Sequence, residues 1–224
     1  MLLPYCIFVA EDSVTLPQIG VRGARVETFS CDGLQCLLSK HELLENISQQ
    51  DALVFYQVIE GVFKQVAVIP FRFPSLLNSE EDLEAHLQAK STVYKEDLKK
   101  FLNLVQMELT ITPKVIDTNK KTSGSGTEYL QSRSQTTHVL ESLANGARSL
   151  SGELVRDWRQ YSLATKYPAL HCYLLVPRAA AQLLRERLNS YSSPPTIIMA
   201  LSGPWPATAF MSSSAAATAQ DHDF

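Results

Sequence analysis

Apolar positions in the first half of the chain change between strand-like and helix-like spacing. An apolar run over 2–10, loose alternation over 25–31 and an apolar stretch over 34–38 predict three strands. A first helix is expected over 52–60, ended at Gly61. The apolar face predicted for this helix consists of Leu53, Tyr56 and Ile59.

The following segment repeats this change of period. A short apolar run over 66–69 predicts a central buried strand. Ser79, followed by three acidic residues, is typical of a helix start, and helical spacing continues to about residue 103. Strict alternation of apolar and polar residues over 105–112 predicts a strand with one wet face. Together these elements predict an α+β domain over residues 1–116.

A linker is predicted at 117–126, because this segment has two glycines and no large apolar residue. Beyond it, apolar residues spaced by three or four over 127–158 predict a long helix. Apolar runs over 171–176 and 196–201 predict two strands, and 179–188 predicts a second helix between them. These elements form a second, smaller α+β unit.

Length and composition agree with this two-domain organisation. The chain has 224 residues, of which 45% are hydrophobic, enough for one large core or two small ones. The second domain is predicted over 127–211. The low-complexity end over 212–224 is expected to be a disordered tail.

The charge balance disfavours a nucleic-acid partner, and the hydropathy pattern disfavours a membrane span. The chain has 20 Lys and Arg against 23 Asp and Glu, so the net charge of −3 provides no general attraction for nucleic acid or anionic lipid. No apolar run approaches the roughly 18 residues needed to cross a bilayer. We therefore expect neither a nucleic-acid partner nor a membrane span.

The N-terminus and the cysteines indicate a cytoplasmic protein. The apolar start has no basic residue before Arg22, contains Pro4 and runs into Glu11, which disfavours a signal peptide and favours a first strand. The four cysteines show no paired spacing, which is typical of reduced, buried thiols rather than a disulfide framework.

Catalytic and metal-binding motifs are incomplete. His41 and Glu45 have the spacing of a zinc-protease pair, but the second histidine is missing. Cys31 and Cys36 lack a second ligand pair at zinc-finger distance. The glycines of 123–126 are not followed by the Lys-Ser or Lys-Thr of a phosphate-binding loop. The sequence predicts no cofactor, no metal site and no enzymatic activity.

Three segments together resemble one family. Leu201–Pro206, followed by Phe210, resembles the Gly-Pro-Trp-Pro-Pro-Tyr-x-Phe signature that closes members of the gas vesicle protein F/L family. Ile69–Phe73 is similar to the family's Leu-Pro-Leu-Arg-Phe segment. Gly126–Leu130 is similar to its Gly-x-x-Tyr-Leu segment. The order and the spacing of the three segments also match the family.

This resemblance implies a fold and a function. It implies two domains, of which the first is a modified ferredoxin-like fold. It also implies an accessory, minor structural protein of gas vesicles that binds the major shell protein, contacts other accessory proteins and assists assembly without catalysis. The expected location is the cytoplasm, at the gas vesicle, on the gas-facing side of the shell.

The residues of the three family segments are the candidate interaction residues. Two readings of Arg72 stay open, a structural anchor and a partner contact. Trp205, fixed between two prolines, packs on its own domain in one reading and contacts a partner in the other. The candidates are Pro70, Arg72, Phe73, Gly126, Tyr129, Leu130, Gly203, Pro204, Trp205, Pro206 and Phe210.

An alternative function places this chain among ligand-binding proteins or enzymes. In this reading it is a cytosolic α+β protein with a site between its two domains, a common place for small-molecule sites. Nucleic-acid binding through a sheet face is a third reading, which the net charge of −3 disfavours.

Overall fold

The computed structural model describes residues 1–9, 14–114, 126–163 and 169–212, with side chains left out at 126–133 and 163. Its mixed α+β fold contains two four-stranded sheets. The chain contacts divide it into two units, one formed by Met1–Leu104 with the chain from Pro206 onward, the other by Val105–Trp205. The chain therefore passes from one unit to the other twice.

This division differs from the predicted domains over 1–116 and 127–211. Strand β5 (Leu104–Pro113) belongs to the second sheet, where it pairs with β8 (Ile197–Trp205), and not to the first domain. Most of the predicted linker at 117–126 and of the predicted tail at 212–224 lies outside the described residues.

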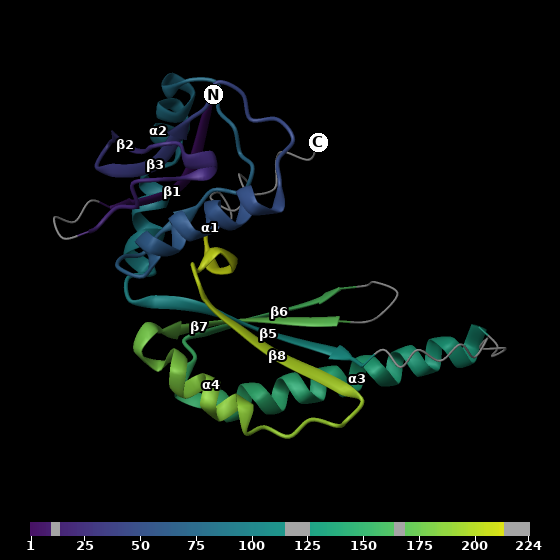
Figure 1. Cartoon of the computed structure of the whole chain (residues 1–224). Helices are drawn as coiled ribbons and strands as arrows, with labels where there is room; N and C mark the ends of the chain where they lie inside the picture. Colours follow the sequence, from purple (N-terminus) through teal and green to yellow (C-terminus); the bar gives the residue numbers. More distant parts are fainter. Residues whose placement is uncertain (10–13, 115–125, 164–168, 213–224) are drawn as a thin grey trace. The chain divides into compact units, whose positions relative to one another are not determined.

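The first unit has an antiparallel sheet in the order β2-β3-β1-β4 and two helices (Figure 1). The strands predicted at 2–10, 25–31 and 34–38 are confirmed. The central strand predicted over 66–69 is wrong in place and length, since β4 begins at Ile69 and lies at the edge of the sheet, beside β1. The elements are β1 (Leu2–Val9), β2 (Val26–Cys31), β3 (Leu34–Lys40), α1 (Gln49–Phe63), β4 (Ile69–Pro70) and α2 (Glu80–Lys100).

Helix α1 differs from its prediction in both length and face. Ser48 caps it through a capping box with Asp51, and the helix continues through Gly61 to Phe63. Leu53 and Tyr56, predicted to face the core, are 51% and 58% exposed. Ile59, the third residue of the predicted face, is buried, together with Phe55, Val58, Val62 and Phe63. The helix carries apolar residues on two faces, and its spacing alone did not distinguish between them.

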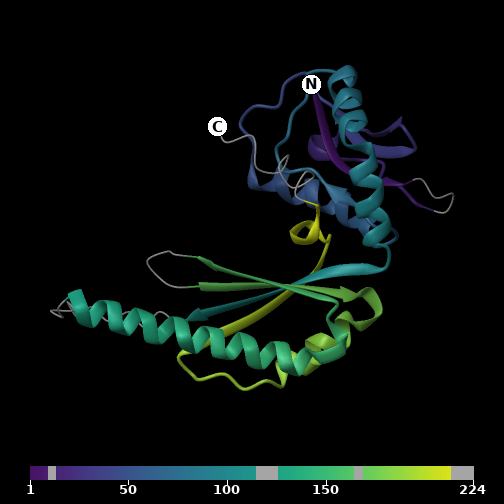
Figure 2. The same cartoon turned by 180° about the vertical axis from the view of Figure 1, so that it is seen from behind.

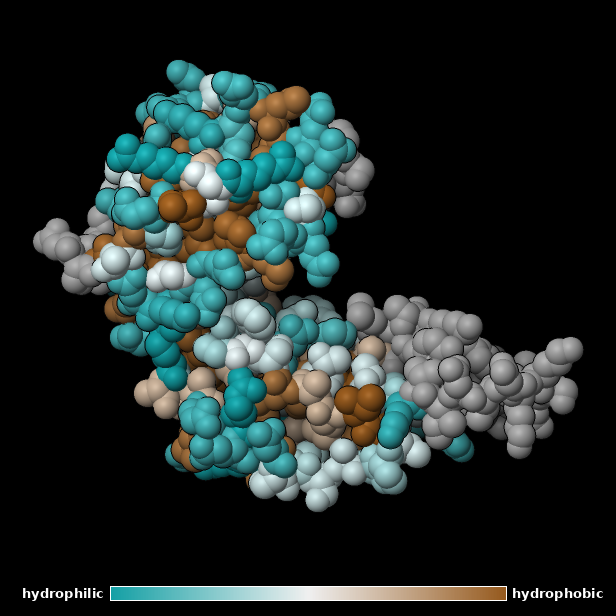
Figure 3. All heavy atoms as spheres, viewed as in Figure 1, coloured by the Kyte–Doolittle hydropathy of each residue, from teal (hydrophilic) through white to brown (hydrophobic). Residues whose placement is uncertain are grey.

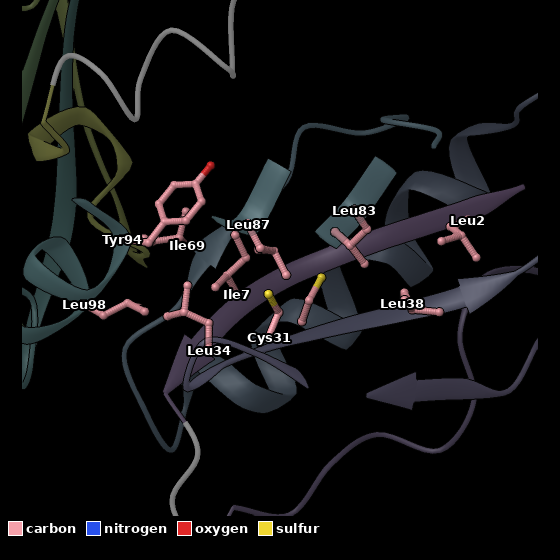
Figure 4. Packing of buried hydrophobic residues seen from close by; sticks show 11 residues of the cluster. Leu2, Ile7, Cys31, Leu34, Leu38, Ile69, Leu83, Leu87, Tyr94 and Leu98 are labelled. Atoms are coloured by element: carbon pink, nitrogen blue, oxygen red, sulfur yellow. The ribbon is translucent and has the colours of Figure 1, made fainter. Parts of the chain in front are cut away.

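Helix α2 begins as the sequence predicted and covers a hydrophobic cluster of the first unit (Figure 4). The hydroxyl of Ser79 accepts a hydrogen bond from the backbone N–H of Asp82, at 3.2 Å. The side chains of the cluster come from α2 and from the four strands of the sheet. They are Leu2, Ile7, Cys31, Leu34, Cys36, Leu38, Ile69, Leu83, Leu87, Tyr94 and Leu98.

The second unit has the sheet order β6-β7-β5-β8. Its elements follow the order β-α-β-β-α-β, which is that of the ferredoxin-like fold. The resemblance placed this fold in the first domain, but the first unit has the order β-β-β-α-β-α. Besides β5 and β8, the elements are α3 (Gly126–Ser151), β6 (Asp157–Leu163), β7 (Ala169–Pro177) and α4 (Ala181–Asn189).

The long helix predicted over 127–158 is wrong at its end. Helix α3 stops at Ser151, because Gly152 has a positive φ of 50°. The chain then turns, and the backbone N–H of Arg156 donates to Leu175 as β6 begins. The alternation predicted for β5 is confirmed on its apolar side, where Val105, Met107, Leu109 and Ile111 are buried. Gln106, on the side predicted to be wet, is buried as well.

Candidate functional site

The family segment around Pro70 contacts three elements of the first unit, β1, α1 and α2. Pro70 lies in β4 opposite Cys6 of β1. Phe73 packs against Phe55 of α1, with ring centroids 4.9 Å apart, and Phe71 lies 5.7 Å from the ring of His86 in α2. These contacts favour the structural reading of the segment. Arg72, between the two phenylalanines, is exposed.

Gly126, Tyr129 and Leu130 lie in the first turns of α3. Their side chains are outside the described part of the structure. The interaction role predicted for them stays a prediction.

At Gly203 two backbone segments of the second unit lie so close together that a side chain would not fit between them. Gly203 has a φ of +110°, and a Cβ at this position would lie 2.8 Å from the carbonyl oxygen of Gln106 and 3.0 Å from Sδ of Met107. Only glycine fits both the conformation and the space. The Arg185 guanidinium of α4 donates to the carbonyl oxygens of Leu201, at 3.1 Å, and Gly203, at 2.7 Å.

Trp205 ends β8 with about half of its surface open, since it is 48% exposed. Its indole N–H donates to the hydroxyl of Ser202 at 3.2 Å. The neighbouring Pro204 is exposed as well. The structure thus leaves an apolar ring available at this position, whose polar atom already has an intramolecular partner.

The end of the same family segment belongs to the first unit. Phe210 is fully buried there, and Lys100 of α2 donates to its carbonyl oxygen at 3.1 Å. Ser212 donates from its backbone N–H and its hydroxyl to the carboxylate of Asp97, at 3.0 and 2.9 Å. The family signature therefore supplies an exposed ring to one unit and a buried anchor to the other.

A row of polar and aromatic side chains crosses the sheet of the second unit. Tyr161 lies opposite His171, and Glu108 lies opposite Ser202, in adjacent strand pairs. Nδ1 of His171 lies 2.8 Å from the Glu108 carboxylate. Burial, the nearby Glu108 carboxylate and Tyr161 raise the pKa of Tyr173, whose ring packs against Tyr161 at 5.7 Å. The neutral phenol of Tyr173 persists at physiological pH.

Sequence reasoning missed this row. It predicted helix through Trp158 and therefore did not find β6, the strand that carries Tyr161. Arg159 and Tyr161 lie on one side of β6, and Gln160 between them lies on the other. This alternation over three residues was the only sequence pattern that could have indicated a strand here.

The cysteines are not poised for chemistry. All four are free and buried. Burial raises the pKa of the Cys6 and Cys172 thiols to about 12. Burial and the neighbouring Cys6 raise the pKa of Cys36 well above its usual value, so these thiols stay protonated. Their positions in the core agree with the predicted role as buried small hydrophobes.

Among the described residues, no group of three His, Cys, Asp or Glu side chains is arranged to hold a metal ion. His41 and Glu45 lie in the irregular segment before α1, and not on the helix that the zinc-type spacing requires. A groove of about 390 Å³ lies along β2, lined in part by Leu16, Pro17 and Arg25. In the part of the chain that the structure describes, no helix is long and apolar enough to span a bilayer.

The comparisons with known proteins identify the family. The family model described as gas vesicle synthesis protein GvpL/GvpF matches residues 2–212. The chain belongs to the GvpL/GvpF family. This confirms the resemblance carried by the three sequence segments. No curated protein sequence matches the chain significantly.

Two solved structures of this family share the fold. The gas vesicle protein GvpF from Anabaena sp. PCC7120 has a TM-score of 0.73 at 16% identity, with 99% of this chain and 97% of that chain covered. GvpF from Microcystis aeruginosa has a TM-score of 0.67 at 15% identity, with 89% of this chain and 94% of that one covered. At these identities the likeness is one of fold.

Proposed function

We propose that this GvpL/GvpF family member is an accessory, minor structural protein of gas vesicles that binds the major shell protein and assists assembly without catalysis. The observation that carries the proposal is the family match over residues 2–212. The proposed location is the cytoplasm, at the vesicle, on the gas-facing side of the shell.

Exposed apolar side chains support a binding role. Hydrophobic residues lie at the surface among hydrophilic ones (Figure 3). Leu53 and Tyr56 of α1 and Trp205 of β8 are each about half exposed. Shell subunits that expose an apolar surface before assembly would aggregate, and a protein with apolar surface of its own is suited to hold them.

Co-expression with the major shell protein tests this proposal. The tagged chain is captured by affinity, and the eluate is examined for the shell subunit, with an unrelated tagged protein as the control bait. We expect the shell subunit in the eluate when this chain is the bait, and not when the unrelated protein is the bait. Its absence with a folded bait would overturn the proposal, and saturable metabolite binding in a thermal-shift screen would then favour the ligand-binding alternative.

A further inference from the structure

A series of hydrogen bonds joins a turn of the first unit to its sheet. The backbone N–H of Val21, in the 3-10 turn Val21–Gly23, donates to the hydroxyl oxygen of Tyr5 at 3.0 Å. This hydroxyl lies 2.8 Å from Oγ of Ser39, and Oγ of Ser39 lies 2.8 Å from Nε2 of His41. Val21, Tyr5, Ser39 and His41 are named here the hydroxyl network.

Strands β1 and β3 place the hydroxyl network on the face of the sheet that α1 covers. Helix α1 lies in front of this sheet in Figure 1, and α2 lies in front of it in Figure 2, the view from behind. The register between β1 and β3 shifts at Tyr5, between Pro4 and Cys6, and such a bulge re-aims a side chain. The Tyr5 ring packs against Phe55 of α1, with ring centroids 5.1 Å apart. The network therefore lies in a packed part of the first unit.

The turn shields the Tyr5 hydroxyl from water. Gly20 and Val21 are buried, and a Cβ at Gly20 would overlap with this hydroxyl. Tyr5 and Ser39 are both 0% exposed, whereas His41 is half-buried. Water therefore reaches the two hydroxyls only if the turn or the His41 ring moves away.

The hydrogens of the network are fully used while His41 is neutral. Burial raises the pKa of Tyr5, so the phenol keeps its hydrogen. The backbone N–H of Val21 can only donate, so Tyr5 accepts from it. With Nε2 of His41 unprotonated, Tyr5 donates to Ser39 and Ser39 donates to this nitrogen. Both buried hydroxyls then have partners for their hydrogens.

Protonation of His41 adds a third hydrogen to the same two contacts. Both imidazole nitrogens then donate, so Nε2 can no longer accept from Ser39. If the ring stays, the Ser39 hydrogen turns to Tyr5, and the Tyr5 hydrogen has no acceptor left in the network. If the ring leaves, Ser39 loses its acceptor. In either case a hydroxyl that is 0% exposed has an unpaired hydrogen, which destabilises the arrangement that buries it.

The charged groups around His41 oppose its protonation on balance. Burial, the Arg22 guanidinium and the α-ammonium of Met1 lower the pKa of His41, whereas the Asp51 carboxylate raises it. Arg22 belongs to the turn, Met1 precedes β1 and Asp51 lies in α1. The folded first unit therefore favours the neutral imidazole.

The charged residues beside His41 in sequence are paired or exposed. Lys40 pairs with Glu27 of β2 at 3.3 Å and with Glu80 of α2 at 2.7 Å. Glu42, on the other side, is exposed. Among these groups, the cation that shares an element with the hydroxyl network is Arg22.

Arg22 fastens the same turn to the segment that follows His41. Its guanidinium donates to the carbonyl oxygen of Glu45, itself an exposed residue, at 2.7 Å and to the Asp51 carboxylate at 3.1 Å. A positive charge on His41 repels this guanidinium. The repulsion and the unpaired hydrogen therefore act on the same turn.

We propose that the hydroxyl network is a pH-sensitive latch: protonation of His41 breaks it and loosens the turn Val21–Gly23 on the sheet. Residues before this turn, Leu16, Pro17 and Gln18, line the groove along β2, so loosening of the turn changes one wall of that groove. The inference concerns a conformational device of the first unit and goes beyond the proposed function.

Amide hydrogen exchange at Val21 tests the proposal. The protection factor of this amide in the full chain is measured by NMR at about pH 7.5 and about pH 5, with correction for the intrinsic effect of pH on exchange. Because the folded state disfavours the protonated imidazole, the latch is complete above the usual His pKa of about 6.5 and is lost as pH falls below it. We expect the protection factor of Val21 to fall about fivefold or more over this range.

Variants of His41 and Ser39 assign the effect. His41→Gln keeps an acceptor for Ser39 but cannot be protonated, so its Val21 protection factor should be equal at both pH values. In Ser39→Ala the hydroxyl that protonation would leave unpaired is gone from the contact with His41, and NMR titration should show a His41 pKa above that of the wild type. Ser39→Thr retains a hydroxyl and should restore the wild-type pKa, which a role in packing alone would not predict.

His138→Gln is the matched control, because His138 is an exposed histidine of α3 in the second unit. It should show the wild-type decrease at Val21. His86 of α2, whose pKa burial also lowers, is still present in His41→Gln, so this variant separates the two histidines. Circular dichroism identifies any variant that has lost its fold, and His41→Gln, at a half-buried position, keeps the test decisive if Ser39→Ala unfolds.

The outcomes decide for or against the latch without any shell protein. A decrease in the wild type and in His138→Gln that His41→Gln lacks supports it. Equal protection of Val21 at both pH values in the wild type, or an equal decrease in His41→Gln, would overturn it. Neither result affects the proposed function, which the co-expression experiment tests separately.

Discussion

The carboxylate of Asp97, in the last turns of α2, accepts two hydrogen bonds from Ser212, 115 residues further along the chain. Asp97 is 1% exposed, so this carboxylate has exchanged water for these donors. With the buried ring of Phe210, the contact fixes the returning end of the chain on the first unit.

Loss of the Asp97 carboxylate should destabilise the first unit. Asp97→Ala removes both acceptors and leaves the Ser212 donors without them, which costs about 1–3 kcal/mol. Urea unfolding followed by circular dichroism measures the change in the free energy of unfolding. Glu96→Ala, at the exposed neighbouring position, is the control and should unfold as the wild type does. Equal midpoints for both variants would contradict this account of the contact.

Truncation of the buried aromatic anchor should have a larger effect. Phe210 is fully buried, so Phe210→Ala leaves a cavity, and such changes cost about 3–5 kcal/mol. The free energy of unfolding from urea titration gives the measurement. Thr208→Ala, at an exposed position of the short 3-10 helix Thr208–Phe210, is expected to change stability by less than about 0.5 kcal/mol. A loss below about 1 kcal/mol for Phe210→Ala would show that Phe210 is not an anchor.

A Cβ at Gly203 should disturb the second unit. Gly203→Ala brings a methyl group to 2.8 Å from the Gln106 carbonyl oxygen at a φ of +110°, a combination that costs about 1–3 kcal/mol or more. Both tryptophans of the chain, Trp158 and Trp205, lie in this unit, so fluorescence reports its unfolding. In the control Gly23→Ala no atom lies within 4 Å of the added methyl group, and the fluorescence transition of the second unit should stay at the wild-type midpoint.

Acid should weaken the start of α1 through Asp51. The Arg22 guanidinium, followed by hydrogen bonding with Ser48, lowers the pKa of Asp51 to about 2. A folded-state pKa below the unfolded value of about 3.9 stabilises the fold above that value, and this contribution is lost as pH falls from about 4 to about 2. In Asp51→Asn the urea midpoint should therefore decrease less over this range than in the wild type.

The control for the acid prediction is Glu60→Gln, an exposed residue of α1 paired with Lys64. Between pH 4 and pH 2 its urea midpoint should decrease by as much as that of the wild type. A parallel decrease in the wild type and Asp51→Asn would show that the pairing of Arg22 with Asp51 contributes nothing to stability in this range.

Local patterns predicted the local elements. The alternation of β5 and the Ser79 cap of α2 are readable because each depends on neighbours in sequence. The face of α1 was predicted wrongly at Leu53 and Tyr56, which are exposed, and correctly at Ile59, which is buried. Phe55, which was not predicted, packs against Tyr5 of β1. Which of two apolar faces is buried depends on the tertiary partner.

The sequence patterns did not predict which distant strands pair with one another. β5 was assigned to the first domain, because nothing near it in sequence indicates its pairing with β8, about 90 residues later. The same pairing places Glu108 opposite Ser202. Family resemblance identified Gly203 and Trp205 as candidates, and the structure adds the strand neighbours that they contact.

Stoichiometric binding of the major shell protein is the central claim, and light scattering tests it most directly. Shell subunit is diluted from denaturant into increasing concentrations of this chain, and its aggregation is recorded. The account predicts that scattering falls in proportion to the amount of chain added and reaches its minimum at a fixed molar ratio, as expected for binding without turnover. Unchanged scattering at a large excess of folded chain, or complete suppression by trace amounts, would contradict it.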